Sequence, residues 1–319
     1  MSSLPLRPFG NTGLQVTALA VGLAPLANMP KTFGYEVPVD QAVETLHAIF
    51  RSPINFLDTA ASYGDGESER RIGLVLHEYG EVPEGYVLAT KVDRDLETRD
   101  YSGDQVRRSL VRSLQLLGLE RLQLVYLHDP EYTTFENVMS RRGPLEVLLR
   151  FRDEGVIEHI GVAGGPIDLM IRYVETGAFE AVITHNRYTL LNRSAEPLLE
   201  TAHRRGLAVV NAAPYGGGIL ARGPREFPRY SYLPASQDLL DRATRMETIC
   251  RRAGVPLAAA ALQFSLRDPR IVSTIVGISR PERVEQLVDL ARHPISDQMW
   301  AELEAVGPVE GDPEAGRWG

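Results

Sequence analysis

Short apolar runs alternate with amphipathic stretches along most of the chain. The apolar runs have the length of buried strands, whereas the amphipathic stretches repeat apolar residues three and four positions apart, as a helix with one buried face does. The apolar runs predict strands at residues 16–23, 54–57, 86–92, 122–127, 156–162, 181–184, 207–212 and 271–276. The amphipathic stretches predict helices at residues 39–51, 68–78, 102–117, 145–154, 167–176, 195–205, 237–253, 257–266 and 283–291.

The order of these elements indicates the fold class. Eight strands that alternate with helices in a chain of 319 residues predict an α/β protein with a (β/α)8 barrel, or TIM barrel. The main alternative is an open, doubly wound sheet, but no Gly-x-Gly-x-x-Gly motif follows the first strand and no P-loop motif occurs. No stretch has the composition of a linker, so we expect one domain over residues 1–319, with a polar C-terminal tail from about residue 301.

Composition and charge exclude several classes of protein. The chain is 44% hydrophobic and 24% charged, as folded proteins are, and its net charge of −8 argues against a nucleic-acid partner. No apolar run approaches the ~18 residues of a membrane span, and the first residues lack the pattern of a signal peptide. The single cysteine, Cys250, can form neither an internal disulfide nor a cysteine zinc site. We therefore expect a cytoplasmic protein without a membrane partner.

Lysine is almost absent from the chain. Of the 34 lysine and arginine residues only Lys31 and Lys91 are lysines, which leaves 34 − 2 = 32 arginines. Coding bias explains this replacement wherever only charge or solubility matters. Lysine, however, changes its pKa readily when it is buried, whereas arginine stays charged. Lys91 lies inside the apolar run 86–92, and this position makes it a candidate functional residue.

Four polar side chains stand at or just after the ends of the second, third and fourth predicted strands. They are Asp58, Tyr63, Lys91 and His128, and in a barrel these strand ends meet at one mouth. Each has an ordinary structural explanation: a turn cap, an exposed aromatic, a side chain at the rim or a core histidine. Together, however, a carboxylate keeps the ammonium charged, and the ammonium lowers the tyrosine pKa toward neutrality. With an imidazole beside the same oxygen, this set favours proton transfer in a carbonyl–alcohol interconversion.

The segments that hold these residues resemble a known family. Leu57-Asp-Thr-Ala-Ala-Ser-Tyr63-Gly, the strand end Thr90-Lys91 and the strand end Leu127-His128 are similar to the catalytic signatures of aldo-keto reductases. The opening Arg7-Pro-Phe-Gly-Asn-Thr-Gly-Leu-Gln-Val16 resembles the N-terminal hairpin that caps the bottom of the barrel in that family. The resemblance extends over residues 7–290.

The resemblance implies a role for each of the four side chains. Tyr63 is the general acid in reduction or the base in oxidation, and Lys91, paired with Asp58, tunes it. His128 orients the substrate oxygen. NADP or NAD lies across the mouth and exchanges a hydride at C4 of its nicotinamide, and no metal is implied.

The resemblance also implies a set of cofactor-binding residues. The glycines after the seventh strand expose backbone N–H groups to a pyrophosphate, although a flexible loop has the same composition. Arg283 contacts a 2′-phosphate or stacks on adenine, with Arg280 as a second cation, unless both are solvated charges at a helix start. The implied residues are Gly22, His185, Asn186, Pro214, Gly216, Gly218, Leu220, Ser279, Arg280, Arg283 and Gln286.

The segments after three of the strands depart from the family pattern. Ala163 and Gly164 stand where the family often has Ser-Asn to hold the nicotinamide carboxamide. His185 stands where a glutamine is common, and Ala212 stands where an aromatic residue often stacks on the ring. We expect His185 and Asn186 to substitute for the missing contacts.

Two further segments narrow the substrate class. Residues 186–191 and 211–220, together with Asp129-Pro130 after the histidine, resemble the aldose 1-dehydrogenases, with pyridoxal 4-dehydrogenases nearby. Such enzymes oxidise the anomeric hydroxyl of a sugar such as L-fucose, or a similar cyclic hemiacetal, to a lactone. The candidate aromatic residues of a sugar pocket are Phe33, Tyr35, Tyr132 and the Tyr230–Tyr232 loop.

Three other functions stay open at this point. The first is an NADPH-dependent aldehyde or ketone reductase of the same family. The second is a nicotinamide-binding regulatory subunit with little catalysis, suggested by the altered carboxamide contacts. The third is a lyase that forms a Schiff base on Lys91, which requires a free amine rather than an ammonium. Cofactor preference and oligomeric state are left open as well.

Overall fold

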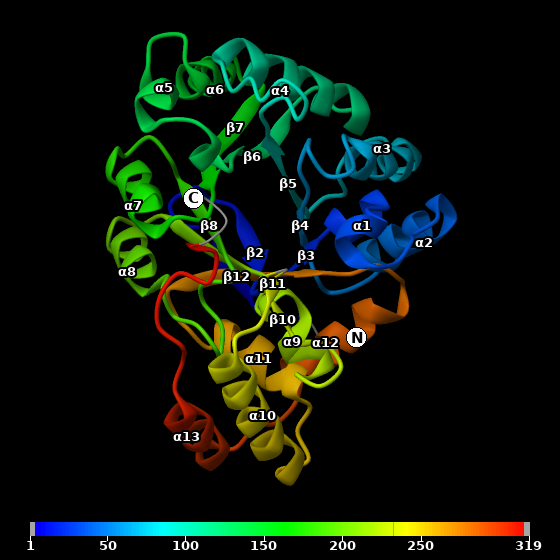
Figure 1. Cartoon of the computed structure of the whole chain (residues 1–319). Helices are drawn as coiled ribbons and strands as arrows, with labels where there is room; N and C mark the ends of the chain where they lie inside the picture. Colours follow the sequence, from blue (N-terminus) through cyan, green and yellow to red (C-terminus); the bar gives the residue numbers. More distant parts are fainter. Residues whose placement is uncertain (1–3, 232, 316–319) are drawn as a thin grey trace.

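The computed structural model describes residues 4–231 and 233–315. Parallel strands form a closed barrel with helices around it, so the predicted fold is confirmed (Figure 1). The strands follow the order β12-β3-β4-β5-β6-β7-β8-β9 around the barrel, which is their order along the chain. They are β3 (Leu19–Gly22), β4 (Phe56–Asp58), β5 (Val87–Val92), β6 (Leu122–His128), β7 (Ile157–Ala163), β8 (Ala181–His185), β9 (Ala208–Ala212) and β12 (Ile271–Gly277).

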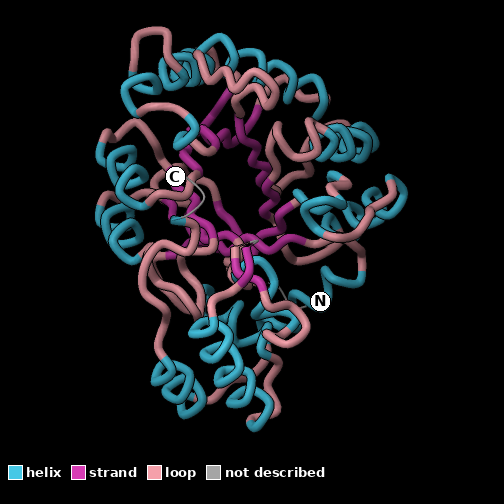
Figure 2. Tube along the Cα trace, viewed as in Figure 1, coloured by secondary structure: helices cyan, strands magenta, loops and turns pink. Residues whose placement is uncertain are grey.

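The helices surround the ring of strands (Figure 2). The apolar faces of most of them pack on the outer face of the barrel, because both faces of a parallel sheet must be covered. The helices at residues 237–252 and 297–306 pack instead in a second apolar cluster outside this layer. None of the helices in the described part is both long and apolar enough to cross a membrane. The helices are α1 (Pro30–Phe33), α2 (Val39–Phe50), α3 (Glu67–Tyr79), α4 (Gly103–Leu117), α5 (Phe135–Met139), α6 (Pro144–Asp153), α7 (Ile167–Glu175), α8 (Glu196–Arg204), α9 (Ile219–Arg222), α10 (Gln237–Arg252), α11 (Leu257–Leu266), α12 (Glu282–Arg292) and α13 (Asp297–Val306).

An antiparallel hairpin of β1 (Leu6–Pro8) and β2 (Gln15–Thr17) closes the N-terminal end of the barrel. Arg7 anchors it by donating from Nη1 to the carbonyl of Ile271, the first residue of β12, at 2.7 Å. The buried ring of Phe9 meets Phe56 edge-on, with centroids 5.5 Å apart. The hairpin therefore lies at the end opposite the strand ends that carry the candidate side chains, as expected.

Two differences from the predicted elements concern the ends of the chain. The strand predicted at 16–23 is two strands, because the chain bends at Ala18 as it passes from the hairpin into the barrel. The tail predicted from residue 301 begins later, since α13 continues to Val306 and starts with a Ser296 cap that accepts from Met299 N–H.

Residues 307–315 run from α13 back to the barrel mouth and end beside β8, as the red segment of Figure 1 shows. Val309 N–H donates to the carbonyl of Leu191 at 2.8 Å, and Asn192 Nδ2 donates to the carbonyl of Gly311 at 2.8 Å. A second hairpin, of β10 (Arg229–Tyr230) and β11 (Leu233–Pro234), follows α9.

Candidate active site

Lys91 and Asp58 form a buried ion pair at the C-terminal ends of β5 and β4. Lys91 is 2% exposed and donates from Nζ to Asp58 Oδ2 at 2.7 Å and to the carbonyl of Thr59 at 2.7 Å. Burial raises the pKa of Asp58, and Lys91 offsets part of this rise. Burial alone disfavours the charged amine, but Asp58 and Tyr63 outweigh it and raise the pKa of Lys91. Lys91 is therefore an ammonium at neutral pH, which does not suit a Schiff-base nucleophile.

Tyr63 lies in the loop between β4 and α3, and its hydroxyl accepts a hydrogen bond from Lys91 Nζ at 3.2 Å. The loop is tied to β5 because Ala61 N–H donates to the Lys91 carbonyl at 3.0 Å. Burial raises the pKa of the Tyr63 hydroxyl above its ordinary value, and the charge of Lys91 offsets only part of the rise. The expected pKa near neutrality is therefore wrong for this structure: the sequence indicates the ammonium but not the depth of burial.

His128 ends β6 and faces Tyr63, with ring centroids 5.9 Å apart and ring planes at 86°. Its Nδ1 lies 2.7 Å from Asp93 Oδ1, and its Nε2 lies 3.5 Å from Asp129 Oδ1. Burial lowers the pKa of His128, but the two carboxylates outweigh burial, so the net direction is upward. The structure thus brings all four predicted side chains together at one mouth.

Asp93 belongs to this group and was not predicted. It is 4% exposed and lies two residues beyond Lys91, just after β5. The sequence does contain a signal for Asp93, because an acidic residue directly after a predicted strand is a candidate for the barrel mouth. The partners Arg187 and Glu314 were also missed, and they are separated by 127 residues, so no local spacing connects them.

Arg187 and Glu314 form a buried ion pair where the C-terminal tail reaches the mouth. Arg187 Nη1 donates to Glu314 Oε2 at 2.7 Å, both side chains are fully buried, and Asp312 Oδ1 lies 2.8 Å from Arg187 Nη2. Glu314 Oε2 is also 3.7 Å from Nδ1 of His185, which is the last residue of β8. The tail therefore contributes a side chain to the surroundings of a predicted cofactor residue.

The side chains of His185 and Asn186 include an acceptor that is available to hydrogen-bond a ligand amide. Asn186 Oδ1 is buried and has no hydrogen-bond partner among the described residues, whereas Asn186 Nδ2 lies 3.4 Å from His185 Nδ1. Burial lowers the pKa of His185, so its imidazole is neutral at neutral pH. A buried acceptor without a partner fits a carboxamide N–H, so these residues suit a nicotinamide cofactor.

The glycine loop after β9 packs closely against two aromatic rings. A Cβ on Gly216 would lie 2.3 Å from the Tyr230 ring, and one on Gly218 would lie 2.9 Å from the Phe227 ring. Both glycine amides donate to carbonyls within the loop. Leu220 is fully buried, and its amide donates within the loop as well. Packing explains why these three positions are small or apolar, and their contact with a cofactor stays a prediction.

The remaining predicted cofactor residues lie around the same end of the barrel. Gly22 ends β3 and pairs with Gly277 of β12, and Pro214 is buried just after β9. Arg280, Arg283 and Gln286 are exposed on and before α12, and Ser279 is half-buried. Burial raises the pKa of the Tyr215 hydroxyl, and the charge of Arg283 offsets part of this rise. Arg283 is therefore near Tyr215, which places the start of α12 beside the glycine loop.

The candidate aromatic residues divide into two groups. Phe33 and Tyr35 stack with centroids 6.0 Å apart, and Tyr132 is exposed beneath a guanidinium 3.3 Å from its centroid. Tyr230 is 3% exposed and donates its hydroxyl to a backbone carbonyl at 2.6 Å, so its hydroxyl proton is already engaged within the protein. Tyr232 lies outside the described residues.

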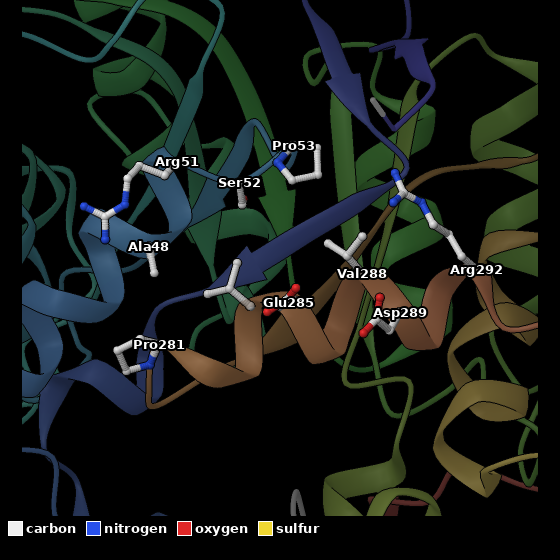
Figure 3. A pocket seen from close by; sticks show the side chains of 10 residues that line it. Ala48, Arg51, Ser52, Pro53, Pro281, Glu285, Val288, Asp289 and Arg292 are labelled. Carbon is white, nitrogen blue, oxygen red and sulfur yellow. The ribbon is translucent and has the colours of Figure 1, made fainter. Parts of the chain in front are cut away.

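A separate hollow of about 260 Å³ lies between α2 and α12 (Figure 3). Its lining includes Pro53, Val288, Arg51 and Asp289, and none of its lining residues is among the predicted site residues. The hollow is therefore distinct from the group of side chains at the mouth.

A closed barrel whose mouth combines a carboxylate, an ammonium, a phenol and an imidazole defines an enzyme built to exchange a proton with a substrate oxygen. Comparison with known families identifies the particular one. Residues 18–308 match the Aldo/keto reductase family, and the chain belongs to this family of oxidoreductases. Members of the family typically use NAD(P)H as cofactor.

Three curated relatives match nearly the whole chain. Pyridoxal 4-dehydrogenase of Microbacterium luteolum is 32% identical, covering 95% of this chain and 97% of the relative. L-galactose dehydrogenase of Arabidopsis thaliana is 31% identical (96% and 95%), and D-threo-aldose 1-dehydrogenase of a Pseudomonas species is 31% identical (91% and 94%). The holo form of aldo-keto reductase AKR11C1 from Bacillus halodurans shares the fold, with a TM-score of 0.78 and 21% identity over 97% of this chain and 99% of that one.

Proposed function

We propose that the protein is an NAD(P)-dependent dehydrogenase that oxidises the anomeric hydroxyl of a sugar, or of a similar cyclic hemiacetal, to a lactone. The observation that carries the proposal is the meeting of Asp58, Tyr63, Lys91 and His128 at one mouth. The substrate class is supported by the three relatives above 30% identity, whose names describe the oxidation of aldoses, L-galactose and pyridoxal.

The side chains divide the reaction between them. When bound, the oxidised nicotinamide supplies the hydride acceptor at C4. Tyr63, in its ionised form, takes the hydroxyl proton as the C–H bond breaks and the C=O bond forms. Lys91 stabilises the phenolate through the 3.2 Å contact, and Asp58 holds the ammonium in place. His128 donates a hydrogen bond to the oxygen that loses its proton.

The cofactor contacts are proposed from the strand ends. Asn186 Oδ1 accepts from the carboxamide with His185 beside it, which compensates for Ala163 and Gly164. The adenosine end lies against the start of α12, where Arg280 and Arg283 are exposed cations that could reach a 2′-phosphate. Ser279, Gln286, Gly22 and Pro214 complete this proposed binding surface.

A second candidate is an NADPH-dependent reductase of aldehydes or ketones. The observation that favours it is the raised pKa of Tyr63, which keeps the hydroxyl protonated at neutral pH and so suits a proton donor. A regulatory subunit with little catalysis is less well supported, because a chain without catalysis has no need of the buried Lys91–Asp58 pair beside Tyr63.

A substrate panel tests the proposal. Purified protein is incubated with L-fucose, D-arabinose, L-galactose and pyridoxal, each with NAD+ and with NADP+, and reduction of the cofactor is followed by absorbance. A parallel reaction contains an aldehyde and NADPH, and oxidation of that cofactor is followed in the same way. We expect turnover of at least one lactol that is lost in Tyr63→Phe. Brisk aldehyde reduction without turnover of any cyclic lactol would establish the reductase instead. Tight cofactor binding with no turnover in either direction would support the regulatory subunit with little catalysis.

A further inference from the structure

Asp93 connects the two side chains that face the substrate oxygen. Its Oδ1 lies 2.7 Å from His128 Nδ1, and its Oδ2 accepts a hydrogen bond from Ser62 N–H at 2.9 Å. Ser62 directly precedes Tyr63, so one carboxylate holds both the imidazole and the tyrosine loop. The Asp93 side chain is 5% exposed.

The backbone of Asp93 is fixed by α4. Asp93 N–H donates to Ser109 Oγ at 3.0 Å, and Gln105 Nε2 donates to the Asp93 carbonyl at 3.2 Å. The carboxylate is therefore carried by an anchored backbone. A rigid, buried acceptor of this kind restricts its neighbours to one arrangement.

We propose that Asp93 is a positioning residue that holds His128 with a proton on Nδ1, turns Nε2 toward the mouth, and sets the distance between the imidazole and Tyr63. An ionised carboxylate only accepts hydrogen bonds, so Nδ1, which lies 2.7 Å from Asp93 Oδ1, must carry the proton. Asp129 Oδ1 lies 3.5 Å from Nε2, which is too far to compete for that proton. The charged imidazole then offers its Nε2–H to the substrate oxygen, whereas the neutral ring offers only a lone pair there. The role in turnover rests on the proposed function, but the position of the proton does not.

The charges around His128 favour its protonated form. Burial opposes the charge, but Asp129 and Asp93 raise the pKa of His128, and Lys91 lowers it. The Nε2–H donor is consequently present below this raised pKa and is lost as the pH rises through it. The titratable groups that face His128 or act on it come from four elements or their adjoining loops. They are Asp58 and Tyr63 (β4), Lys91, Asp93 and Tyr101 (β5), Asp129 and Glu131 (β6), and His185 (β8), and the Tyr101 hydroxyl donates to the His128 carbonyl.

The variant Asp93→Asn tests this role because the hydrogen bond from Ser62 N–H fixes the orientation of the asparagine side-chain amide. The N–H is a fixed donor, so the asparagine oxygen has to face it, and the NH2 group then faces His128. The imidazole Nδ1 can accept from NH2 only without its own proton. The variant therefore moves the proton of the neutral ring to Nε2 and removes the negative charge beside it.

The first measurement is NMR of the full chain labelled with 15N-histidine. Nitrogen shifts distinguish the two neutral tautomers, and His128→Gln assigns the signal among the seven histidines. We expect Nδ1–H in the wild-type ring at alkaline pH and Nε2–H in Asp93→Asn, with the titration midpoint lowered by about one pH unit or more. Nε2–H in the wild-type protein would overturn the proposal, even if the variant does not fold.

The second measurement is the pH profile of kcat/KM for whichever lactol or aldehyde is turned over. In the wild type we expect an alkaline break at the His128 midpoint that NMR reports. In Asp93→Asn the break disappears, because the neutral ring keeps Nε2–H. We also expect kcat to fall about tenfold with KM little changed, because a neutral donor replaces a charged one. A lowered rate with the wild-type break retained would mean that Asp93 is only structural.

Glu180 provides a matched control at the opposite end of the barrel. Its Oε1 lies 2.9 Å from His159 Nδ1, and its Oε2 accepts from Ile160 N–H at 3.1 Å, the same arrangement as at Asp93. Glu180→Gln should leave the pH profile unchanged, and an equal change there would refute a local effect. If no substrate is turned over, the proposed function fails but the NMR result stands. If turnover occurs and the His128 tautomer is the same in Asp93→Asn, only the role of Asp93 fails.

Discussion

The ion pair between Arg187 and Glu314 predicts that a single substitution, Glu314→Gln, releases the C-terminal tail. Both side chains are fully buried, so the substitution leaves a guanidinium without its main counter-charge. Breaking a buried pair in this way costs about 3–5 kcal/mol. Asp312 still lies 2.8 Å from Arg187, which places the expected cost at the lower end, about 3 kcal/mol.

The free energy that docks the tail sets an upper limit to this loss of stability. Once residues 307–315 detach, water reaches Arg187, and the penalty cannot grow beyond the free energy that docks the tail. The loss should therefore appear as local opening rather than as global unfolding. Because about 1.4 kcal/mol corresponds to a factor of ten, we expect roughly hundredfold faster hydrogen exchange in the tail. The informative probe is Val309, whose N–H donates to the Leu191 carbonyl.

The assay is hydrogen exchange of the full chain followed by mass spectrometry of the C-terminal peptide. Glu304→Gln is the matched control: it breaks the pair between Glu304 Oε2 and Arg193 Nη2, 2.7 Å apart, in which Glu304 is 61% exposed. Exposed pairs contribute about 0–1 kcal/mol, so the control should change exchange by less than about fivefold. If Glu314→Gln exchanges no faster than Glu304→Gln, the buried pair is not what holds the tail.

Three further predictions concern the mouth. Lys91→Arg keeps the charge, but its larger guanidinium cannot replace Nζ between Asp58 and Tyr63. We therefore expect kcat to fall at least about 100-fold while the circular dichroism spectrum is unchanged. Near-wild-type turnover would contradict the role of Lys91. Because burial raises the pKa of Tyr63, the phenolate is scarce at neutral pH, so kcat/KM for oxidation should rise with pH below the His128 midpoint. Tyr63 stays protonated over the same range, so it does not limit reduction there. Oxidation that is fastest at acidic pH would refute Tyr63 as the base. Arg283→Ala should raise KM for NADP+ about tenfold and leave KM for NAD+ nearly unchanged; equal effects on both would indicate stacking on adenine instead.

The strand-end side chains could be predicted because each one lies at or shortly after the end of an apolar run, where the barrel topology places functional groups. Lys91 interrupts the run that becomes β5, and His128 ends β6, so periodicity and the rule for barrel mouths were sufficient. The pKa of Tyr63 could not be predicted with the correct sign. Burial and the charge of Lys91 act in opposite directions on it, and only the three-dimensional structure shows which is larger.

The glycine loop shows why composition alone does not explain a glycine. Gly216 and Gly218 have the composition of a phosphate-binding loop, yet the space where their Cβ atoms would lie is filled by Tyr230 and Phe227. Those rings come later in the chain, and their approach depends on how residues after α9 fold back. The Arg187–Glu314 pair could not be predicted for the same reason, since the two residues meet only because the chain after α13 returns to the mouth.

Asp93 is a different case, because two simple rules place it opposite His128. Side chains two apart on a strand share a face, so the direction that makes Lys91 line the barrel extends to Asp93. Along the β5–β6 pair, Lys91 lies opposite Tyr126 and Val92 lies opposite Leu127. One residue further, the same register brings Asp93 to His128, where the two side chains are in contact at 2.7 Å. The register of two neighbouring strands therefore selects the carboxylate that meets the imidazole, and a shift of one residue would separate them.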